Sequence, residues 1–253
     1  MEGISGSVSA MTLDLASLES VRTFAKEFNG KFGKLEVLVA NAGVMNTPNG
    51  KTVDGFDTQF GTNHLGHFLL VDLLREKLLN TEGSRVVLLS SLYHDIAQGK
   101  VGKIDFDDLQ FERRPYDGWT AYAQSKLANL LMASEMAKRY PKITTVALHP
   151  GFVNSNLLKL TRVECVDHFI VNWMMYPVFK YGLGMISPWE GAQVSLHCIL
   201  DDKLENGKYY SQNSSPRGCV GGFPAVSTNV DANDDSVGVR LWAVSEELVG
   251  VKK

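Results

Sequence analysis

The sequence predicts an α/β fold in which helices cover both faces of a doubly wound parallel sheet. Mainly apolar runs occur at Leu35–Ala40, Arg85–Leu89 and Ile143–Leu148, and each has the length of a buried parallel strand. Amphipathic segments of helical length separate these runs. Small or polar residues follow each run directly, at the strand ends where open α/β sheets bind their ligands.

The composition is that of an ordinary globular protein. The chain has 253 residues, 44% of them hydrophobic and 21% charged, which suits one large domain over residues 1–253. A formal net charge of -3 and the lack of a Lys/Arg-rich block argue against a nucleic-acid partner. Three scattered cysteines without metal-ligand spacing, and no visible signal peptide or membrane span, predict a cytoplasmic protein without a metal site.

A tyrosine and a lysine lie four residues apart in the segment Trp119–Met132. Apolar residues recur there at helical spacing, so Tyr122 and Lys126 share one face of a predicted helix. A free phenol has a pKa of about 10, and a nearby cation favours the phenolate, which makes tyrosine a usable proton donor and acceptor. The same interval recurs at Tyr176 and Lys180, but an intervening proline and an aromatic run there indicate packing.

Four further motifs occur with this pair in a fixed order. They are Asn41-Ala42-Gly43, Asn63 within NHLGHF, Ser90-Ser91 and His149-Pro150-Gly151. With these motifs the chain resembles the short-chain dehydrogenase/reductase family, which implies a Rossmann-like fold. The segments NAGVM, NHLGHF, VLLSS, AYAQSKLANLL and HPGFVNSNL are most similar to its retinol-dehydrogenase-like branch. The resemblance extends from Val8 to Tyr210.

The resemblance implies a role for each site residue. Ser91 would hold the substrate oxygen while Tyr122 transfers its proton. Lys126 would lower the pKa of Tyr122 and contact the nicotinamide ribose, and Asn63 would distort its helix and hold a water in a proton relay to Lys126. The cofactor would be NADP, towards which the branch leans, or NAD. Besides Tyr122 and Lys126, the implied cofactor contacts are Asp14 at the adenine, Asn41, Ala42 and Gly43 beside the adenosine half, and Pro150, Gly151, Val153 and Ser155 along the nicotinamide.

The N-terminal segment departs from the family pattern. Val8–Leu15 is similar to the third strand of the family, and Ser17–Phe28 is a serine-capped amphipathic helix. The strand and glycine-rich turn that hold a pyrophosphate at a helix N-terminus should come first, but Gly3 and Gly6 are the only early glycines and no apolar strand precedes them. The fold is therefore N-terminally truncated, and the strand at Val8–Leu15 must pair with Leu35–Ala40 or fray.

Substrate selection is predicted in residues 156–187. This stretch is rich in large apolar side chains, which suit an adaptable lid over a lipophilic substrate, although core packing is the competing interpretation. Beyond it we expect a helix that starts at Ser187–Glu190, with a proline in its first turn, and continues to Leu200. A short strand at Lys208–Tyr210 and a loop over Ser211–Asp235 should follow. An amphipathic helix over residues 235–249 would dock on the body or on a partner, which leaves a homo-oligomer open.

Two functions remain in competition. The first is an NAD(P)(H)-dependent oxidoreductase that interconverts a lipophilic alcohol and its ketone or aldehyde by hydride transfer, in secondary or lipid metabolism. The second is a catalytically silent remnant that keeps the reaction residues, cannot bind cofactor and acts, if at all, by binding. The missing glycine-rich unit separates them. It fits a truncated or mis-spliced gene product, which we favour, an engineered fragment or a natural short form.

Overall fold

A central sheet organises the fold. The computed structural model describes residues 6–95, 102–155, 157, 185–215, 218–227 and 229–251. In these residues the sheet has five strands in the order β1-β2-β3-β4-β5. The strands are β1 (Val37–Ala40), β2 (Arg85–Leu89), β3 (Thr144–His149), β4 (Tyr209–Ser215) and β5 (Gly218–Ala225). The first four run parallel and β5 returns antiparallel to β4. The predicted parallel α/β fold is confirmed.

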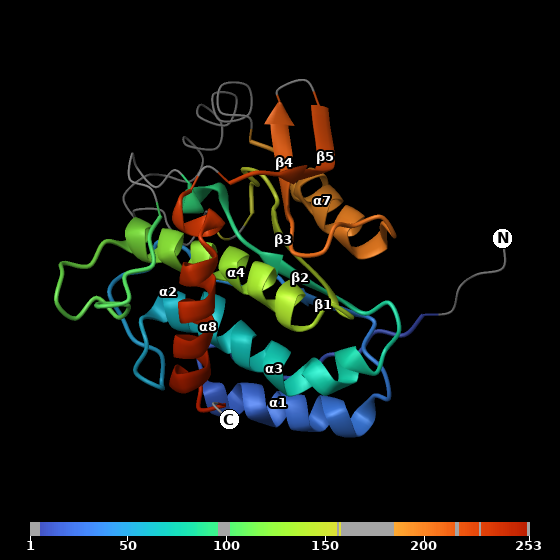
Figure 1. Cartoon of the computed structure of the whole chain (residues 1–253), viewed down its shortest axis with the longest axis horizontal. Helices are drawn as coiled ribbons and strands as arrows, with labels where there is room; N and C mark the ends of the chain where they lie inside the picture. Colours follow the sequence, from blue (N-terminus) through green and yellow to red (C-terminus); the bar gives the residue numbers. More distant parts are fainter. Residues whose placement is uncertain are drawn as a thin grey trace, which may run out of the picture.

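Helices cover both faces of this sheet (Figure 1). One face shares a large hydrophobic core with α1 (Leu18–Lys31), α3 (Gly66–Leu79), α4 (Gly118–Arg139) and α8 (Asp235–Leu248). The other face packs a smaller apolar cluster against α7 (Pro188–Leu200). Shorter elements are α2 (Thr58–Phe60), the π-helical turn η1 (Gly61–Leu65) and the 3-10 turns η2 (Leu92–His94) and η5 (Asp231–Asn233). The C-terminal helix α8 packs across α4 (Figure 1).

Local signals in the sequence explain where the helices begin. The Ser17 side chain accepts a hydrogen bond from the Ser20 backbone and starts α1, as predicted. A reciprocal capping box between Ser187 and Glu190, with a proline in the first turn, starts α7. The helical stretch from Thr58 to Leu79 is divided by η1 into α2 and α3.

The segment Val8–Leu15 is not a strand: the predicted pairing with Leu35–Ala40 is wrong, and the alternative, an unpaired segment, is what the structure shows. Figure 1 shows the first described residues projecting from the body of the molecule, and Val8 is 102% exposed. A strand is stabilised by hydrogen bonds to a neighbouring strand, and the described structure has none between this segment and β1. Leu15 alone is buried, and its carbonyl oxygen lies so close to Gly66 that a Cβ there would approach it to 2.4 Å.

The predicted loop over Ser211–Asp235 is also partly wrong. β4 continues to Ser215, and β5 returns beside it with a register shift between Ser211 and Asn213. Glycine, serine, proline and asparagine are rare in strands, so composition alone favoured a loop. Pairing with β3 and β4 outweighs that weak local preference.

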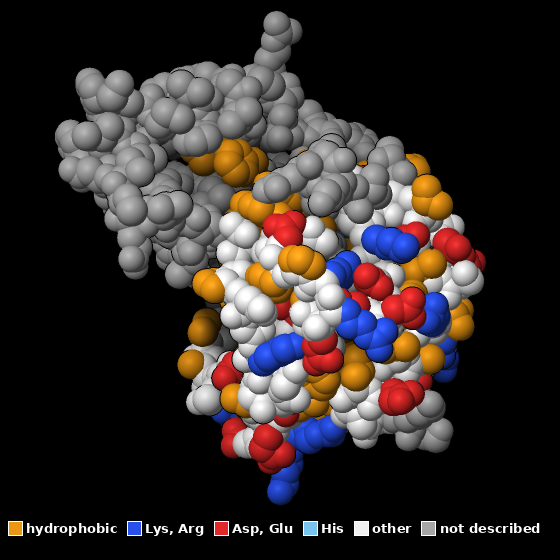
Figure 2. Space-filling model, turned by 90° about the vertical axis from the view of Figure 1, so that its left-hand side faces the viewer, with side chains coloured by type: hydrophobic (Ala, Val, Ile, Leu, Met, Phe, Trp, Pro, Cys, Tyr) orange, Lys and Arg blue, Asp and Glu red, His pale blue; other side chains and the backbone are white. Residues whose placement is uncertain are grey.

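Several predictions fall outside the described residues. The predicted lid at 156–187 is described only at Leu157 and at residues 185–187, and Tyr176 and Lys180 are likewise outside the described ranges. Among the helices that are described, none is both long and apolar enough to cross a membrane. On the surface seen in Figure 2, basic and acidic side chains are interspersed over the described part.

Candidate active site

The chain segments that carry the predicted site leave the sheet at one edge. β1, β2 and β3 are parallel, and their register aligns Ala40 with Leu88 and Leu88 with Ala147. The loops after these strands therefore begin side by side, at the carboxyl edge where open α/β sheets bind ligands. These loops are Asn41–Gly43, Ser90–Ser91 and Pro150–Ser155.

Tyr122 and Lys126 face the end of β2 from α4. Their side chains are buried, with relative exposures of 4% and 5%. The Lys126 Nζ lies 5.6 Å from the centroid of the Tyr122 ring and donates a hydrogen bond to the Leu89 carbonyl at 3.1 Å. Asp117 caps α4 by accepting hydrogen bonds from the backbone of its first turn. The structure thus brings the pair together on one helix face.

Burial dominates the ionisation of both groups. It raises the pKa of Tyr122 to about 12, while Ser91 lowers that pKa and Tyr93 raises it further. Burial also lowers the pKa of Lys126 to about 8. In this structure Ser91 is the neighbour that lowers the tyrosine pKa. The lowering by Lys126 that the resemblance implies stays a prediction.

Asn63 joins three elements at the centre of the site. It is fully buried in η1, which confirms the predicted local distortion of its helix. Its Nδ2 donates to the Val44 carbonyl and to Ser125 Oγ, both at 2.9 Å, and its Oδ1 accepts from the Val44 amide at 2.8 Å. A Cβ on Gly43 would approach Asn63 Oδ1 to 2.8 Å and Lys126 Nζ to 3.5 Å. Glycine is therefore required for this close approach.

The two histidines that flank Asn63 are packing residues. His64 is fully buried between Asn129 and Ser245, and burial lowers its pKa to about 3. His67 places Nδ1 2.9 Å from the Asn63 carbonyl, and burial lowers its pKa to about 4. Both rings are therefore neutral at physiological pH. Among the described residues, no group of three His, Cys, Asp or Glu side chains is placed to hold a metal ion.

The serines after β2 connect the sheet to α4. Ser90 Oγ donates to the Lys126 carbonyl at 2.8 Å and fixes the strand end against the helix. Ser91 is half-buried, and its Oγ accepts from the Tyr93 amide at 3.3 Å. The Tyr93 ring meets the Tyr122 ring edge-on, with centroids 5.8 Å apart. This packing places the Ser91 hydroxyl beside Tyr122.

The loop Pro150–Ser155 is held against the start of α7. Gly151 has a φ of 90°, a left-handed conformation that favours glycine. Val153 pairs with Ile186 in a parallel bridge. A Cβ on Gly191 would approach Val153 Cγ2 to 2.4 Å, so glycine lets α7 come close to the loop. The residues expected along the nicotinamide thus form one ordered segment.

Among the described residues, no recorded hydrogen bond joins Asp14 to these loops. It is exposed, its Oδ1 accepts from the Ala16 amide at 2.9 Å, and its own amide donates to Ser20 Oγ at 2.9 Å. These bonds form the turn that precedes α1. Asn41 and Ala42 are exposed at the end of β1 and remain accessible to a ligand.

Sequence reasoning missed two contributors to the site. The Leu89 carbonyl accepts from Lys126 Nζ and, at 3.0 Å, from Asn129 Nδ2. A backbone carbonyl gives no sequence signal. Asn129 could have been found, because it lies three residues after Lys126 on the same face of α4.

The described residues fit one end of a nicotinamide nucleotide. An ammonium group has three donors, and in the described chain the Leu89 carbonyl is the only acceptor recorded for Lys126 Nζ. The other donors suit ribose hydroxyls at the carboxyl edge of the sheet. The described ranges contain no glycine-rich turn between a strand and a helix, so they supply no pyrophosphate cradle of the usual kind.

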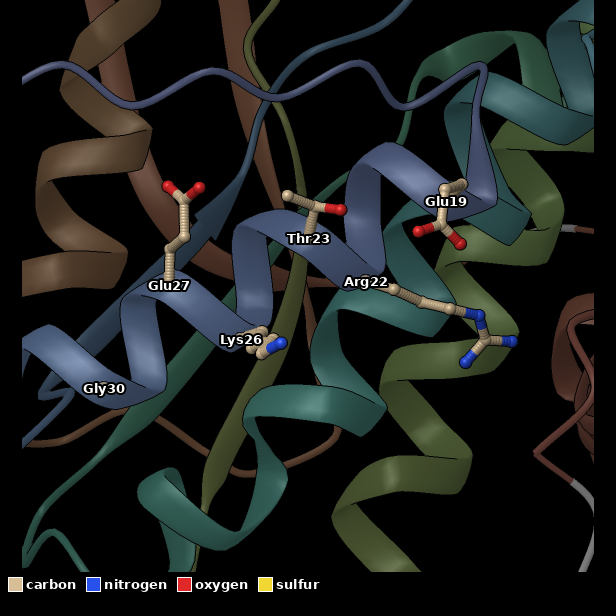
Figure 3. A pocket seen from close by; sticks show the side chains of 6 residues that line it. All are labelled: Glu19, Arg22, Thr23, Lys26, Glu27 and Gly30. Carbon is tan, nitrogen blue, oxygen red and sulfur yellow. The ribbon is translucent and has the colours of Figure 1, made fainter.

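A separate hollow lies on the outward face of α1 (Figure 3). Its lining comes from one helix and carries both signs of charge, as expected for the solvent face of an amphipathic helix. None of its residues belongs to the predicted site. The lining residues are Glu19, Arg22, Thr23, Lys26, Glu27 and Gly30.

Comparisons with known proteins agree with this geometry. Residues 1–104 match the sequence profile of the family described as short chain dehydrogenase. Retinol dehydrogenase 12 of Mus musculus is 42% identical to the chain, over 95% of the chain and 69% of that protein. The chain belongs to the short-chain dehydrogenase/reductase family. Within the family it lies in the retinol-dehydrogenase-like branch, and it is an oxidoreductase of CH-OH groups.

Solved structures show the same fold. A structure of an uncharacterised protein from Mycobacterium paratuberculosis is 34% identical, with a TM-score of 0.70 over 94% of this chain and 74% of that chain. The NADPH-bound carbonyl reductase from chicken fatty liver has a TM-score of 0.52 at 16% identity, over 79% and 72%. The second likeness supports the fold alone. Members of the family use NAD(P).

Proposed function

We propose that this chain interconverts a lipophilic alcohol and its ketone or aldehyde with NADP(H), or with NAD(H) as the less favoured cofactor. The observation that carries the proposal is the pair of buried side chains, Tyr122 and Lys126, next to the half-buried Ser91. They lie where the parallel strands end. The cofactor, when bound, supplies or accepts the hydride.

Proton transfer is assigned to Tyr122. In reduction the substrate oxygen gains a proton, and in oxidation the hydroxyl loses one. Because burial raises the pKa of Tyr122 to about 12, the phenol carries its proton at neutral pH and is ready to donate it to a carbonyl oxygen. Ser91 holds that oxygen and, by interacting with the phenol, also favours its ionisation. Alcohol oxidation should therefore need a higher pH than carbonyl reduction.

Lys126 and Asn63 orient the reacting groups. With a pKa of about 8, Lys126 is mostly charged at neutral pH, and its donors beyond the Leu89 carbonyl are assigned to the nicotinamide ribose. Asn63 fixes the loop after β1 through Val44 and is assigned the water of a proton relay to Lys126. Orientation of this kind supplies a large part of the rate enhancement in two-substrate reactions.

The lipophilic substrate is proposed from relatives and from composition. The relatives are named retinol dehydrogenases, and residues 156–187 carry the large apolar side chains expected of a lid. A retinoid is therefore the first substrate to test, and a role in secondary or lipid metabolism follows from that class. A single domain over residues 1–253, a cytoplasmic location and a homo-oligomer stay predictions.

The proposal is tested by following NADPH consumption with all-trans-retinal, and NADP formation in reverse with retinol at alkaline pH. The wild-type chain should turn over, and a Tyr122→Phe variant that binds NADPH equally well should not. Equal turnover by the two chains would contradict the assignment of proton transfer to Tyr122. The rates with NADPH and NADH decide between the two cofactors.

A second candidate function is the catalytically silent remnant. The observation that favours it is the lack of a pyrophosphate cradle within the described ranges. A folded chain that takes up neither NADPH nor NADH would establish it. Turnover of any carbonyl that depends on Tyr122 would exclude it.

A further inference from the structure

A buried histidine connects Ser91 to the C-terminal part of the chain. His94 ends η2, three residues after Ser91, and its side chain is 0% exposed. Its Nδ1 donates to the Ser91 carbonyl, which can only accept, so this nitrogen carries the proton. Its Nε2 lies 2.9 Å from Ser227 Oγ. One imidazole ring therefore joins the backbone of Ser91 to the segment that follows β5.

The same segment binds η2 at further points. Asp95 Oδ1 accepts from Ser227 Oγ at 2.6 Å and from the Asn229 amide at 2.8 Å. Asn229 Nδ2 donates to the His94 carbonyl at 2.5 Å and to the Gly102 carbonyl at 2.7 Å. Side chain and backbone of the turn are thus both fixed by Ser227 and Asn229. The Ser227 hydroxyl has one hydrogen, so it donates either to His94 Nε2 or to Asp95 Oδ1, and the hydrogen bonds of Asn229 hold the turn in both cases.

The turn that is fixed in this way carries the residues that face the proton donor. Ser91 and Tyr93 lie next to Tyr122, and the Tyr93 amide donates to Ser91 Oγ at 3.3 Å. Movement of η2 would therefore shift the Ser91 hydroxyl relative to the phenol. The sequence gives no sign of this role, because a lone histidine after a strand has no characteristic spacing to other residues.

We propose that His94 is a positioning residue: it holds the Ser91 carbonyl against Ser227 and Asn229 and so fixes the Ser91 hydroxyl beside Tyr122. The inference rests on the proposed function for its kinetic consequence. His94 acts through Ser91 and need not touch substrate or cofactor. Its loss should therefore reduce kcat and leave KM and cofactor affinity nearly unchanged.

The pH profile gives a readout that a merely structural role would not change. The groups that face the Tyr122 phenol are Ser91, Tyr93 and Lys126, and Ser91 is the one that lowers its pKa. Displacement of Ser91 removes this influence. The apparent pKa for alcohol oxidation should then rise in the variant.

The kinetic test compares H94A, H94N and S227A with the wild-type chain. H94A should lose about 10-fold to 100-fold in kcat with little change in KM, because small misplacements of a reacting group are costly. Asparagine keeps a donor near the position of Nδ1, so H94N should recover most of the activity and the wild-type pH profile. The kcat of S227A should lie between that of H94A and that of the wild type.

His197→Ala is the matched control. This partly exposed histidine pairs with Asp201 at 3.4 Å near the start of β2, at the opposite edge of the sheet from Ser91. H197A should behave as the wild type. A kcat and pH profile of H94A that equal those of H197A would overturn the proposal.

Hydrogen exchange tests the same contact without turnover. Amides of residues 91–95 should exchange faster in H94A and S227A than in the wild-type chain, and H94N should protect them. An inactive wild-type chain would refute the proposed function and leave this measurement valid. Unchanged exchange in both H94A and S227A would overturn the positioning role, and S227A serves if H94A does not fold.

Discussion

The middle of the sheet and its β1 edge differ sharply in packing. Val86, Val87 and Leu88 of β2 are 0% exposed. In β1, by contrast, Val37–Val39 are half-buried, and in the segment before α1, Val8 is 102% exposed. The proposed proton-transfer residues lie beside the well-packed strand β2. The loop expected at the adenosine, Asn41–Gly43, follows the less buried strand β1. The chain therefore preserves the reaction centre better than the surface that would hold the nucleotide.

Contacts between different elements determine how firmly each side chain of the site is held in place. Tyr122, Lys126 and Asn63 are each held by neighbours from other elements, so their positions are determined by the whole core. Asn41 and Ala42 are exposed beyond a strand that has one partner in the described structure. Substitutions around the middle strands should therefore cause large losses of activity or stability, and substitutions at the β1 side of the sheet should cause small ones.

The largest effect is expected from Tyr122→Phe. The substitution removes the proton donor and keeps the buried ring, so carbonyl reduction should fall by about 10²-fold to 10⁴-fold while the fold is retained. Steady-state kinetics and a thermal melt measure the two quantities. Tyr140→Phe, at the C-terminal end of α4, is the matched control and should keep full activity. If Tyr122→Phe lowers the rate of carbonyl reduction by less than threefold, Tyr122 is not the proton donor.

Lys126→Met should abolish activity and, at pH 7, increase stability. Because the folded-state pKa of about 8 lies below the ordinary value of 10.5, the folded chain binds this proton more weakly than the unfolded chain. The charged lysine therefore costs about 3 kcal/mol below pH 8, and the cost disappears as the pH rises to 10.5.

Urea unfolding at pH 7 to 10 measures this cost. Stability of the wild-type chain should rise relative to Lys126→Met across pH 8 to 10, the variant should be the more stable protein at pH 7, and it should be inactive. A stability difference that does not change with pH would contradict the burial of a charged lysine.

Gly43→Ala should have an intermediate effect. Its Cβ would approach Asn63 Oδ1 to 2.8 Å, and Asn63 is fixed by its hydrogen bonds to Val44 and Ser125. We expect a loss of about 1–3 kcal/mol in unfolding free energy and a reduced turnover rate. Gly33→Ala is the control, because a Cβ there meets nothing within 4 Å. Equal stabilities of the two variants would show that the site tolerates displacement of Asn63.

The smallest effect is expected from Val8→Ser. Val8 is fully exposed in a segment that does not join the sheet, so the unfolding free energy should change by less than about 0.5 kcal/mol. Chemical denaturation measures it. A loss above 1.5 kcal/mol would indicate that the segment does form a strand beside β1, and would remove the contrast between the two regions.

The sequence predicts most of the structure around the middle strands of the sheet and little of the structure at its outer strands. β2 was predicted at its observed bounds, and the helix carrying Tyr122 and Lys126 was found from spacing, because buried strands and amphipathic helices leave periodic signals. The missing strand at Val8–Leu15 and the unexpected β5 both depend on whether a neighbouring strand is present, which local sequence does not encode.

The chemistry of the site was predicted less completely than its residues. The identities of Ser91, Tyr122, Lys126 and Asn63 followed from motifs, and the structure brings them together. The direction of the Lys126 ammonium could not be predicted, because its acceptor is a backbone carbonyl. The network around His94 depends on segments more than a hundred residues apart along the chain.

Calorimetric titration of NADPH, and then NADH, into the wild-type and Lys126→Met chains measures whether the chain binds the nucleotide and whether Lys126 holds it. We expect about micromolar binding to the wild-type chain, weakened about tenfold or more in the variant by the loss of charge-assisted hydrogen bonds. Equal affinities would show that Lys126 does not contact the nucleotide. No binding by a folded wild-type chain would contradict the oxidoreductase function proposed for it and would favour the silent remnant.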